Sequence, residues 1–133
     1  MSAESGFVLF LVLTVGLLGV VVWTGLHARR RLHLCCVAAT LAALGVTIYF
    51  AERMGRHYDL SSAGWITPVH LALAKLTTVL YLAPLTTGVL TLRDAAWRRR
   101  HRVCAFVVVG LTVLTAVTGT WMILAAQRLP QAS

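Results

Sequence analysis

The chain consists of long, nearly continuous apolar runs separated by short polar turns. Four of these runs extend over about 7–26, 34–51, 66–92 and 103–126, and a helix needs roughly 20 such residues to cross a hydrocarbon core. The runs do not alternate apolar with polar positions, so they favour helices over the strands of a membrane barrel. The pattern therefore predicts an all-α, polytopic membrane protein, an up-down bundle of four transmembrane helices that forms a single domain.

Proline and threonine add detail to the predicted helices. Pro84 lies inside the third run, and because proline removes a backbone N–H, we expect a bend near mid-membrane that widens an internal pocket. Thr112, Thr115 and Thr118 recur every three residues in the last run. We interpret these threonines as structural, with hydroxyls that bond across the bundle or to carbonyls of their own helix.

Composition and charge agree with a membrane protein. The 133 residues are 59% hydrophobic and 12% charged, which leaves too little polar surface to cover a soluble globule. Arginines gather in the turns after the first and third runs: Arg29, Arg30, Arg31, Arg93, Arg98, Arg99, Arg100 and Arg102. Such short basic loops stay in the cytoplasm, so both termini are predicted outside. The net charge of +8 then reflects topology and contact with anionic inner-leaflet lipid, not a nucleic-acid partner, and we expect the inner (cytoplasmic) membrane of a bacterium.

One short signature occurs twice. In both copies a run of arginines precedes a histidine and, three residues later, a cysteine: His33 with Cys36, and His101 with Cys104. The Thr-Gly dipeptides at 24–25 and 87–88 also correspond. The interpretation is a duplicated helical hairpin, which would place His33 and His101 on facing, parallel helices at matching depth. The alternative is that the positive-inside rule alone explains why arginines occur at the same points of both hairpins.

The paired histidines and cysteines are candidate ligands at the inner side. Residues three apart share one face of a helix, so each His–Cys pair offers two ligands from one side. Neutral imidazoles of His33 and His101 fit the iron of a b-type heme, with nearby arginines pairing with the propionates. Together with Cys36 and Cys104 they also match a tetrahedral zinc or Cu(I) set, although the arginines oppose a bare cation. Alternatively, the cysteines are small apolar residues.

A second candidate cluster lies around the loop that joins the second and third runs. Glu52, His57, Asp59 and His70 are close together in the sequence there, and His70, His57 and Glu52 are the expected ligands for copper or a second heme. His70 carries more weight because it falls in the first turns of an apolar run, where an ionisable side chain is usually functional. His57 has the alternative of simply facing water.

Lys75 is the only lysine of the chain and lies inside the third run. A charge at this depth needs a partner, and the expected partner is Glu52, which Lys75 would reach by extending toward the interface. The alternative is a proton or quinone site built from Lys75, His70 and Glu52, to which Tyr49 or Tyr81 adds a hydroxyl.

Scattered residues over about 32–124 carry a resemblance to a known family. They are His33, Gly64, His70, Leu71, Ala72, Pro84, Leu85, Arg100, His101, Arg102, Thr118 and Gly119. In these residues the chain resembles the CtaM/YozB-type proteins, which are small four-helix membrane proteins associated with the biogenesis of heme-copper terminal oxidases. The resemblance implies a role in oxidase assembly, with heme or copper as the cofactor and a respiratory oxidase or other membrane complex as the partner.

Three functions remain after the common catalytic motifs are considered. The sequence contains no Gly-rich phosphate loop, no Gly-x-Ser-x-Gly elbow and no His-Glu-x-x-His, which argues against a kinase or hydrolase. A non-enzymatic assembly factor for a heme-copper oxidase is the leading hypothesis. The alternatives are a b-type cytochrome or quinone-interacting redox or anchor subunit, and a structural subunit without a cofactor.

Overall fold

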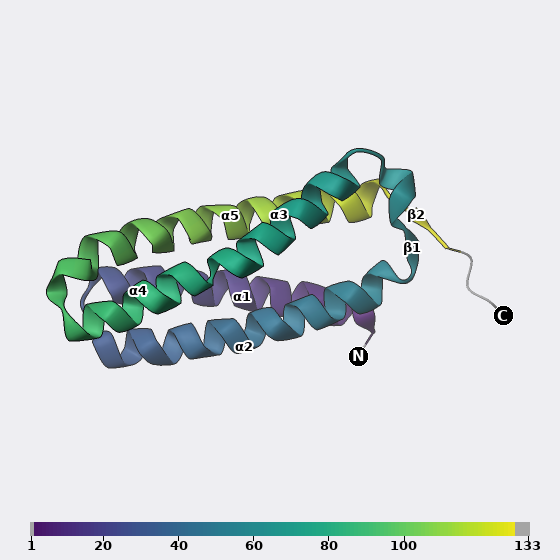
Figure 1. The fold of residues 1–133 in the computed structure, drawn as a ribbon. Coiled ribbons are helices and arrows are strands. Elements are labelled where there is room, and N and C mark those ends of the chain that lie inside the picture. The colour runs from purple at the N-terminus through teal and green to yellow at the C-terminus, as the bar shows by residue number, and fades with distance from the viewer. Residues whose placement is uncertain (1, 130–133) are drawn as a thin grey trace. The chain divides into compact units, whose positions relative to one another are not determined.

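The computed structural model describes residues 2–129, and nearly all of them are helical (Figure 1). The chain divides into two compact units, each built around one helical hairpin. The first unit contains the described residues 2–59 and 127–129, and the second contains Leu60–Ala126. Each unit is described separately below.

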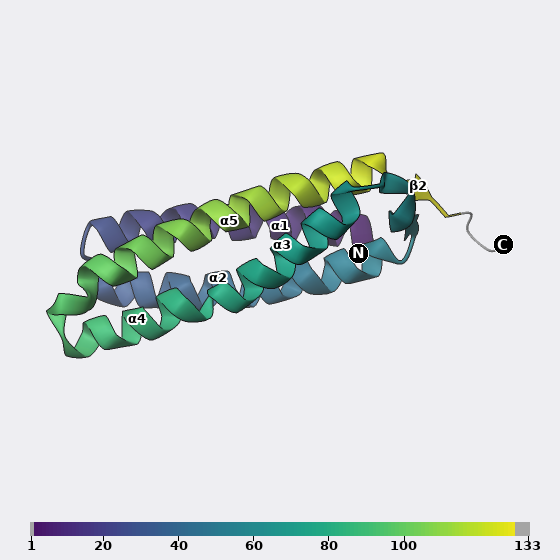
Figure 2. The same ribbon diagram turned by 45° about the horizontal axis from the view of Figure 1, so that its top comes forward.

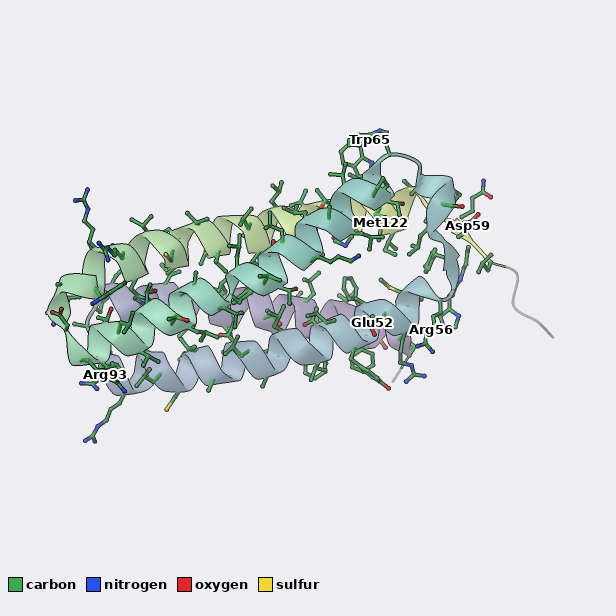
Figure 3. The ribbon with its side chains drawn as sticks, in the orientation of Figure 1. Glu52, Arg56, Asp59, Trp65, Arg93 and Met122 are labelled. Atoms are coloured by element: carbon green, nitrogen blue, oxygen red, sulfur yellow. The ribbon has the colours of Figure 1, made fainter. Side chains whose placement is uncertain are left out.

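The first unit is a hairpin of two long helices, α1 (Ala3–Leu26) and α2 (Arg30–Gly55). Ser2 caps α1 by accepting a hydrogen bond of 3.1 Å from the backbone N–H of Ser5, which satisfies one of the donors that every helix start leaves open. Figure 3 shows Glu52 and Arg56 near the end of α2, where the chain leads toward Asp59. The helices α1 and α2 contact each other along their length.

A small sheet joins the end of this hairpin to the C-terminal segment. Strand β1 (Tyr58–Asp59) pairs antiparallel with β2 (Gln127–Arg128), with Tyr58 opposite Arg128. The side chains add an ion pair of 2.8 Å between Arg128 Nη2 and Glu4 Oε1, and the Tyr58 hydroxyl donates to the same Glu4 oxygen at 3.3 Å. We call Glu4, Tyr58 and Arg128 the terminal clasp. It connects the start of α1 with the two strands β1 and β2.

The second unit is also a hairpin, but its first arm is broken into two helices. Its elements are η1 (Leu60–Ala63), α3 (Ile66–Leu80), α4 (Leu82–Arg93), η2 (Ala95–Trp97) and α5 (Arg98–Ala125). In Figures 1 and 2, α3 leads directly into α4, and α5 runs back alongside both. The rings of Trp65 and Trp121 meet edge to face at 5.4 Å near the open end of this hairpin.

The third apolar run is interrupted at Tyr81, three residues before Pro84, whereas the bend and the wider pocket expected from this proline stay predictions. Pro84 has no N–H to donate to the carbonyl of Leu80, and its ring crowds that carbonyl. Accordingly α3 ends at Leu80, and Tyr81 separates it from α4. The next backbone bond, from Leu85 N–H to Tyr81 O, is long at 3.4 Å.

The helices extend beyond the predicted apolar runs. Helix α1 begins four residues earlier than predicted, α2 covers Arg30–Gly55 in place of 34–51, and α5 begins at Arg98 in place of residue 103. The predictions counted apolar positions only, whereas Arg and Glu are good helix formers and continue a helix into the interface. As a result, His33 and His101 lie within the first turns of α2 and α5.

Within residues 2–129, four helical segments are long and apolar enough to cross a membrane, which indicates an integral membrane protein. These segments are Ala3–Leu26, Arg30–Gly55, Ile66–Arg93 and Ala95–Ala125. The buried polar side chains among the described residues are all threonines: Thr14, Thr24, Thr40, Thr47, Thr77 and Thr112. A threonine hydroxyl can bond to a carbonyl of its own helix, so it can be buried between apolar helices at little cost.

The two hairpins repeat the same contacts at equivalent positions. In the first unit the hydroxyls of Thr14 and Thr47 lie 3.0 Å apart, and in the second unit those of Thr77 and Thr115 lie 3.1 Å apart. Each hairpin has two arms, the one before its turn and the one after it. A residue in the first arm of the first hairpin corresponds to the residue 63 positions later in the second hairpin, and a residue in the second arm corresponds to the one 68 positions later. The first residues of the arms follow the same two spacings. This is the pattern that an internal duplication leaves.

Candidate histidine sites

Three histidines lie against Thr-Gly dipeptides of the neighbouring helix in their own hairpin. His33 of α2 meets Thr24-Gly25 of α1, His101 of α5 meets Thr87-Gly88 of α4, and His70 of α3 meets Thr118-Gly119 of α5. The sequence contains three Thr-Gly dipeptides, and each of them serves one of the three histidines that were predicted as cofactor ligands.

The His33 site shows how such a contact fixes an imidazole ring. Its Nδ1 lies 3.0 Å from the carbonyl oxygen of Val21 and 3.3 Å from the hydroxyl oxygen of Thr24. A carbonyl oxygen only accepts hydrogen bonds, so Nδ1 carries the proton and donates. In the neutral ring Nε2 is then the unprotonated nitrogen. The hydroxyl of Thr24 donates to Val20 O at 2.8 Å, which leaves its oxygen able to accept from the ring.

His101 repeats this arrangement in the second unit. Its Nδ1 lies 3.1 Å from the carbonyl oxygen of Pro84 and 3.3 Å from the hydroxyl oxygen of Thr87. Pro84 and Thr87 are the equivalents of Val21 and Thr24 by the spacing of the duplicated hairpin. The sequence interpretation gave Pro84 only the role of bending the helix, and the structure adds a second role as the acceptor for His101.

His70 makes the same kind of contact near the other end of the second hairpin. Its Nδ1 lies 3.1 Å from the hydroxyl oxygen of Thr118, and the ring also hydrogen-bonds the backbone of Thr115. As at the other two histidines, the threonine that contacts the ring, Thr118, follows the backbone partner, Thr115, by three residues. Interpreting Thr118 as purely structural was therefore incomplete, because it orients a histidine. The signal in the sequence was the third Thr-Gly dipeptide.

The glycines let the imidazole rings lie close to the facing helix. A Cβ built on Gly25 would lie 3.2 Å from Cε1 of His33, one on Gly88 would lie 3.3 Å from Cε1 of His101, and one on Gly119 would lie only 2.7 Å from Cε1 of His70. Glycine in a helix interior costs about 1 kcal/mol relative to alanine. The close approach of the imidazole ring is a physical reason for glycine at these three positions in spite of this cost.

The described residues of the first unit include no counterpart of the His70 site. The spacing of the duplication places Phe7 at the position of His70 and Phe50 at the position of Thr118. Phe50 packs against Gly6 and stacks on Phe10 with ring centroids 5.8 Å apart. Apolar packing therefore closes this end of the first hairpin, whereas a hydrogen-bonded histidine closes the corresponding end of the second.

The cysteines and the outer-loop residues form no metal cluster within a unit. In residues 2–129 no three His, Cys, Asp or Glu side chains come together as a set that could hold a metal ion. Cys36 and Cys104 are partly buried, and both are free thiols. The expected inner set draws one His–Cys pair from each unit, and the expected outer set joins Glu52 and His57 to a histidine of the other unit. Both sets stay predictions.

The remaining candidate residues have separate surroundings. The side chains of Glu52 and His57 are exposed in the first unit, and Lys75 is exposed on α3 of the second. The pair between Lys75 and Glu52 stays a prediction, because the two residues belong to different units. The hydroxyl of Tyr81 lies 2.8 Å from that of Thr112, and Tyr49 accepts a hydrogen bond of 3.4 Å from Arg53.

The geometry of the histidine sites is suited to metal binding through Nε2. A metal-bound histidine almost always donates its other ring N–H to a carbonyl, carboxylate or water, which fixes the tautomer and raises the basicity of the ligating nitrogen. The carbonyls of Val21 and Pro84 supply this contact for His33 and His101.

No family model, curated protein sequence or solved structure matches the chain.

Proposed function

We propose that this integral membrane protein binds heme or copper through Nε2 of His33, His101 and His70, and that it serves the assembly of a heme-copper oxidase. The single observation that carries the binding proposal is the repeated hydrogen bond from Nδ1 to a helix carbonyl. Both heme iron and copper take a neutral imidazole nitrogen as ligand. The role in oxidase assembly rests on the resemblance to the CtaM/YozB-type proteins.

The main competing interpretation is that the histidines only hold the hairpins together. Two features of the first unit argue against it. Phe50 and Gly6 close one end of that hairpin without any histidine, and Thr14 with Thr47 connects its middle by a hydroxyl pair. Packing and interhelical bonding are therefore available without an ionisable ring, which is costly to bury in a membrane and usually functional there.

An optical spectrum tests the proposal directly. We would add heme or Cu(I) to detergent-purified protein, record oxidised and dithionite-reduced spectra, and measure bound metal in wild type, His33→Ala, His101→Ala and His70→Ala. His27→Ala is the matched control, because Nδ1 of His27 also contacts a carbonyl, Trp23 O at 2.8 Å, but within its own helix and at an exposed position.

The expected result is cofactor binding that falls in the three site variants and stays at the wild-type level in His27→Ala. A protein that takes up neither heme nor copper overturns the binding proposal. The assembly role is tested by expressing the same variants in cells that lack the wild-type chain and measuring oxidase activity. Loss of oxidase activity in the site variants with normal membrane levels supports that role. Oxidase activity that does not depend on the chain contradicts it.

A further inference from the structure

A pair of hydroxyl groups lies at the interruption of the second hairpin. The hydroxyl oxygen of Tyr81, the residue between α3 and α4, lies 2.8 Å from that of Thr112 on α5. The Thr112 hydroxyl donates to Val108 O at 2.7 Å, so Tyr81 is the donor of the pair. Tyr81 is half-buried and Thr112 is only 8% exposed. The contact therefore ties the interruption directly to the uninterrupted helix α5.

The first hairpin has neither the interruption nor the hydroxyl pair. By the spacing of the duplication, Leu18 occupies the position of Tyr81, and Leu44 occupies the position of Thr112. Leucine side chains cannot form a hydrogen bond, and α1 continues through Leu18 without a break. The interruption and the hydroxyl pair thus occur together, in the same hairpin and at the same residue.

The interruption changes what holds α4 in place. Each turn of a continuous helix is fixed by hydrogen bonds to the turn before it. Pro84 has no N–H to offer to the carbonyl of Leu80, and the bond from Leu85 N–H to Tyr81 O is long at 3.4 Å. Helix α4 is therefore attached to α3 less firmly than the corresponding halves of α1 are attached to each other. Its position depends more on its contacts with α5.

The position of α4 decides the hydrogen bond of His101. The ring donates through Nδ1 to the carbonyl oxygen of Pro84 at 3.1 Å, and Pro84 comes three residues after Tyr81. Because such bonds weaken steeply with distance and misalignment, a shift of α4 by about 1 Å would remove this one. A contact that fixes the start of α4 against α5 therefore also fixes the acceptor of His101.

We propose that Tyr81 is a positioning residue for His101, and that its bond to Thr112 replaces the helical continuity that Pro84 removes. The inference rests on the proposed function, in which Nδ1–H of His101 has to be held so that Nε2 can bind a metal. The Tyr81 hydroxyl was a candidate for a proton or quinone site. Here it acts through the backbone instead, because it fixes the start of α4 and α4 presents the Pro84 carbonyl.

The tautomer of His101 tests this role, and ¹⁵N NMR of protein with labelled histidines measures it. We would compare wild type in detergent, without any cofactor, with Y81F and T112V, and assign the His101 signals with His101→Ala. Each variant removes one partner of the hydroxyl pair, so T112V serves if Y81F does not fold. T112S keeps the hydroxyl. T78V is the second control, because the exposed Thr78 hydroxyl donates to Ala74 O of its own helix.

Wild type is expected to hold the proton of His101 on Nδ1. In Y81F and T112V a second His101 signal should appear, with the proton on Nε2. His33 and His70 should not change, since their Nδ1 partners lie on α1 and α5. Both controls should match wild type. In P84A/Y81F the restored N–H makes the hydroxyl pair dispensable, so His101 should keep the wild-type tautomer. The heme or Cu(I) affinity of Y81F should fall about two- to tenfold, the contribution of one ordinary hydrogen bond.

Three results would overturn the inference: an unchanged His101 signal in both Y81F and T112V, an equal change at His70, or a wild-type His101 ring already protonated on Nε2. An equal change at His70 would indicate a general loss of packing in the hairpin. The tautomer is measured without a cofactor, so its outcome is independent of the proposed function. A tautomer change in a protein that takes up neither heme nor Cu(I) supports the positioning role of Tyr81 while the proposed function falls.

Discussion

Nδ1 of His101 lies 3.1 Å from the carbonyl oxygen of Pro84. The residue that interrupts the first arm of the second hairpin is therefore also the residue that orients the histidine of the second arm. In the first hairpin the same position is Val21, and the helix there is continuous. The break and the histidine contact are thus separable features, and the contact is the one that both hairpins share.

Gly119→Ala should destabilise the second hairpin. The new Cβ would lie 2.7 Å from Cε1 of His70, so the ring has to move, and overpacking of this kind costs about 1–3 kcal/mol of unfolding free energy. The higher helix propensity of alanine offsets about 1 kcal/mol of this cost. Gly110→Ala is the control in the same helix, since its Cβ would meet no atom within 4 Å, and it should be neutral or stabilising. Unfolding in mixed detergent measures both variants. Equal stability of the two would contradict the close contact.

Thr87→Val should weaken cofactor binding while the protein stays folded. It removes the hydroxyl 3.3 Å from Nδ1 of His101, and loss of such an outer contact typically lowers metal affinity about 10–100-fold. Thr86→Val is the control, because the exposed Thr86 hydroxyl donates only to Leu82 O on its own helix. Heme titration compares the two variants, and Thr87→Ser should restore binding. Identical affinities in both Val variants would remove the positioning role of Thr87.

Thr14 and Thr47 should show a measurable coupling energy. Their hydroxyls lie 3.0 Å apart in the first hairpin, and polar pairs between membrane helices contribute about 0.6 kcal/mol on average in double-mutant cycles. Single and double Val variants of Thr14 and Thr47 give the coupling by unfolding free energy. Thr77 and Thr115, which are 3.1 Å apart, should give a similar value. Strictly additive effects at both pairs would refute the hydroxyl contacts, and clearly unequal coupling energies would contradict the equivalence of the two hairpins.

Glu4→Gln should loosen the C-terminal segment without lowering global stability. The ion pair with Arg128 is exposed, with 56% and 46% of the two side chains accessible, and exposed pairs contribute about 0–1 kcal/mol. Limited proteolysis should cleave the segment around Arg128 faster in the variant, while the thermal midpoint stays unchanged. Glu52→Gln, at another exposed carboxylate of the first unit, is the control and should leave cleavage around Arg128 unchanged. A large drop in the midpoint would show that the clasp stabilises the whole unit.

The sequence predicted the helices better than it predicted their contacts. Continuous apolar runs and arginine clusters were enough to predict four helices and to place His33 and His101 at helix starts. The partners of these histidines could not be derived in the same way, because a contact between helices depends on their rotation and register. The recurrence of Thr-Gly in both hairpins was a signal. Its meaning became clear only when Gly25 and Gly88 were found beneath the two rings.

The pairing of β1 with β2 has a consequence for the order in which the protein is made. Tyr58 leaves the ribosome long before Arg128, its partner in the sheet. The whole second hairpin must be synthesised and passed to the membrane before that partner exists. The first hairpin can therefore form early, but its terminal clasp can close only after the second hairpin has been synthesised.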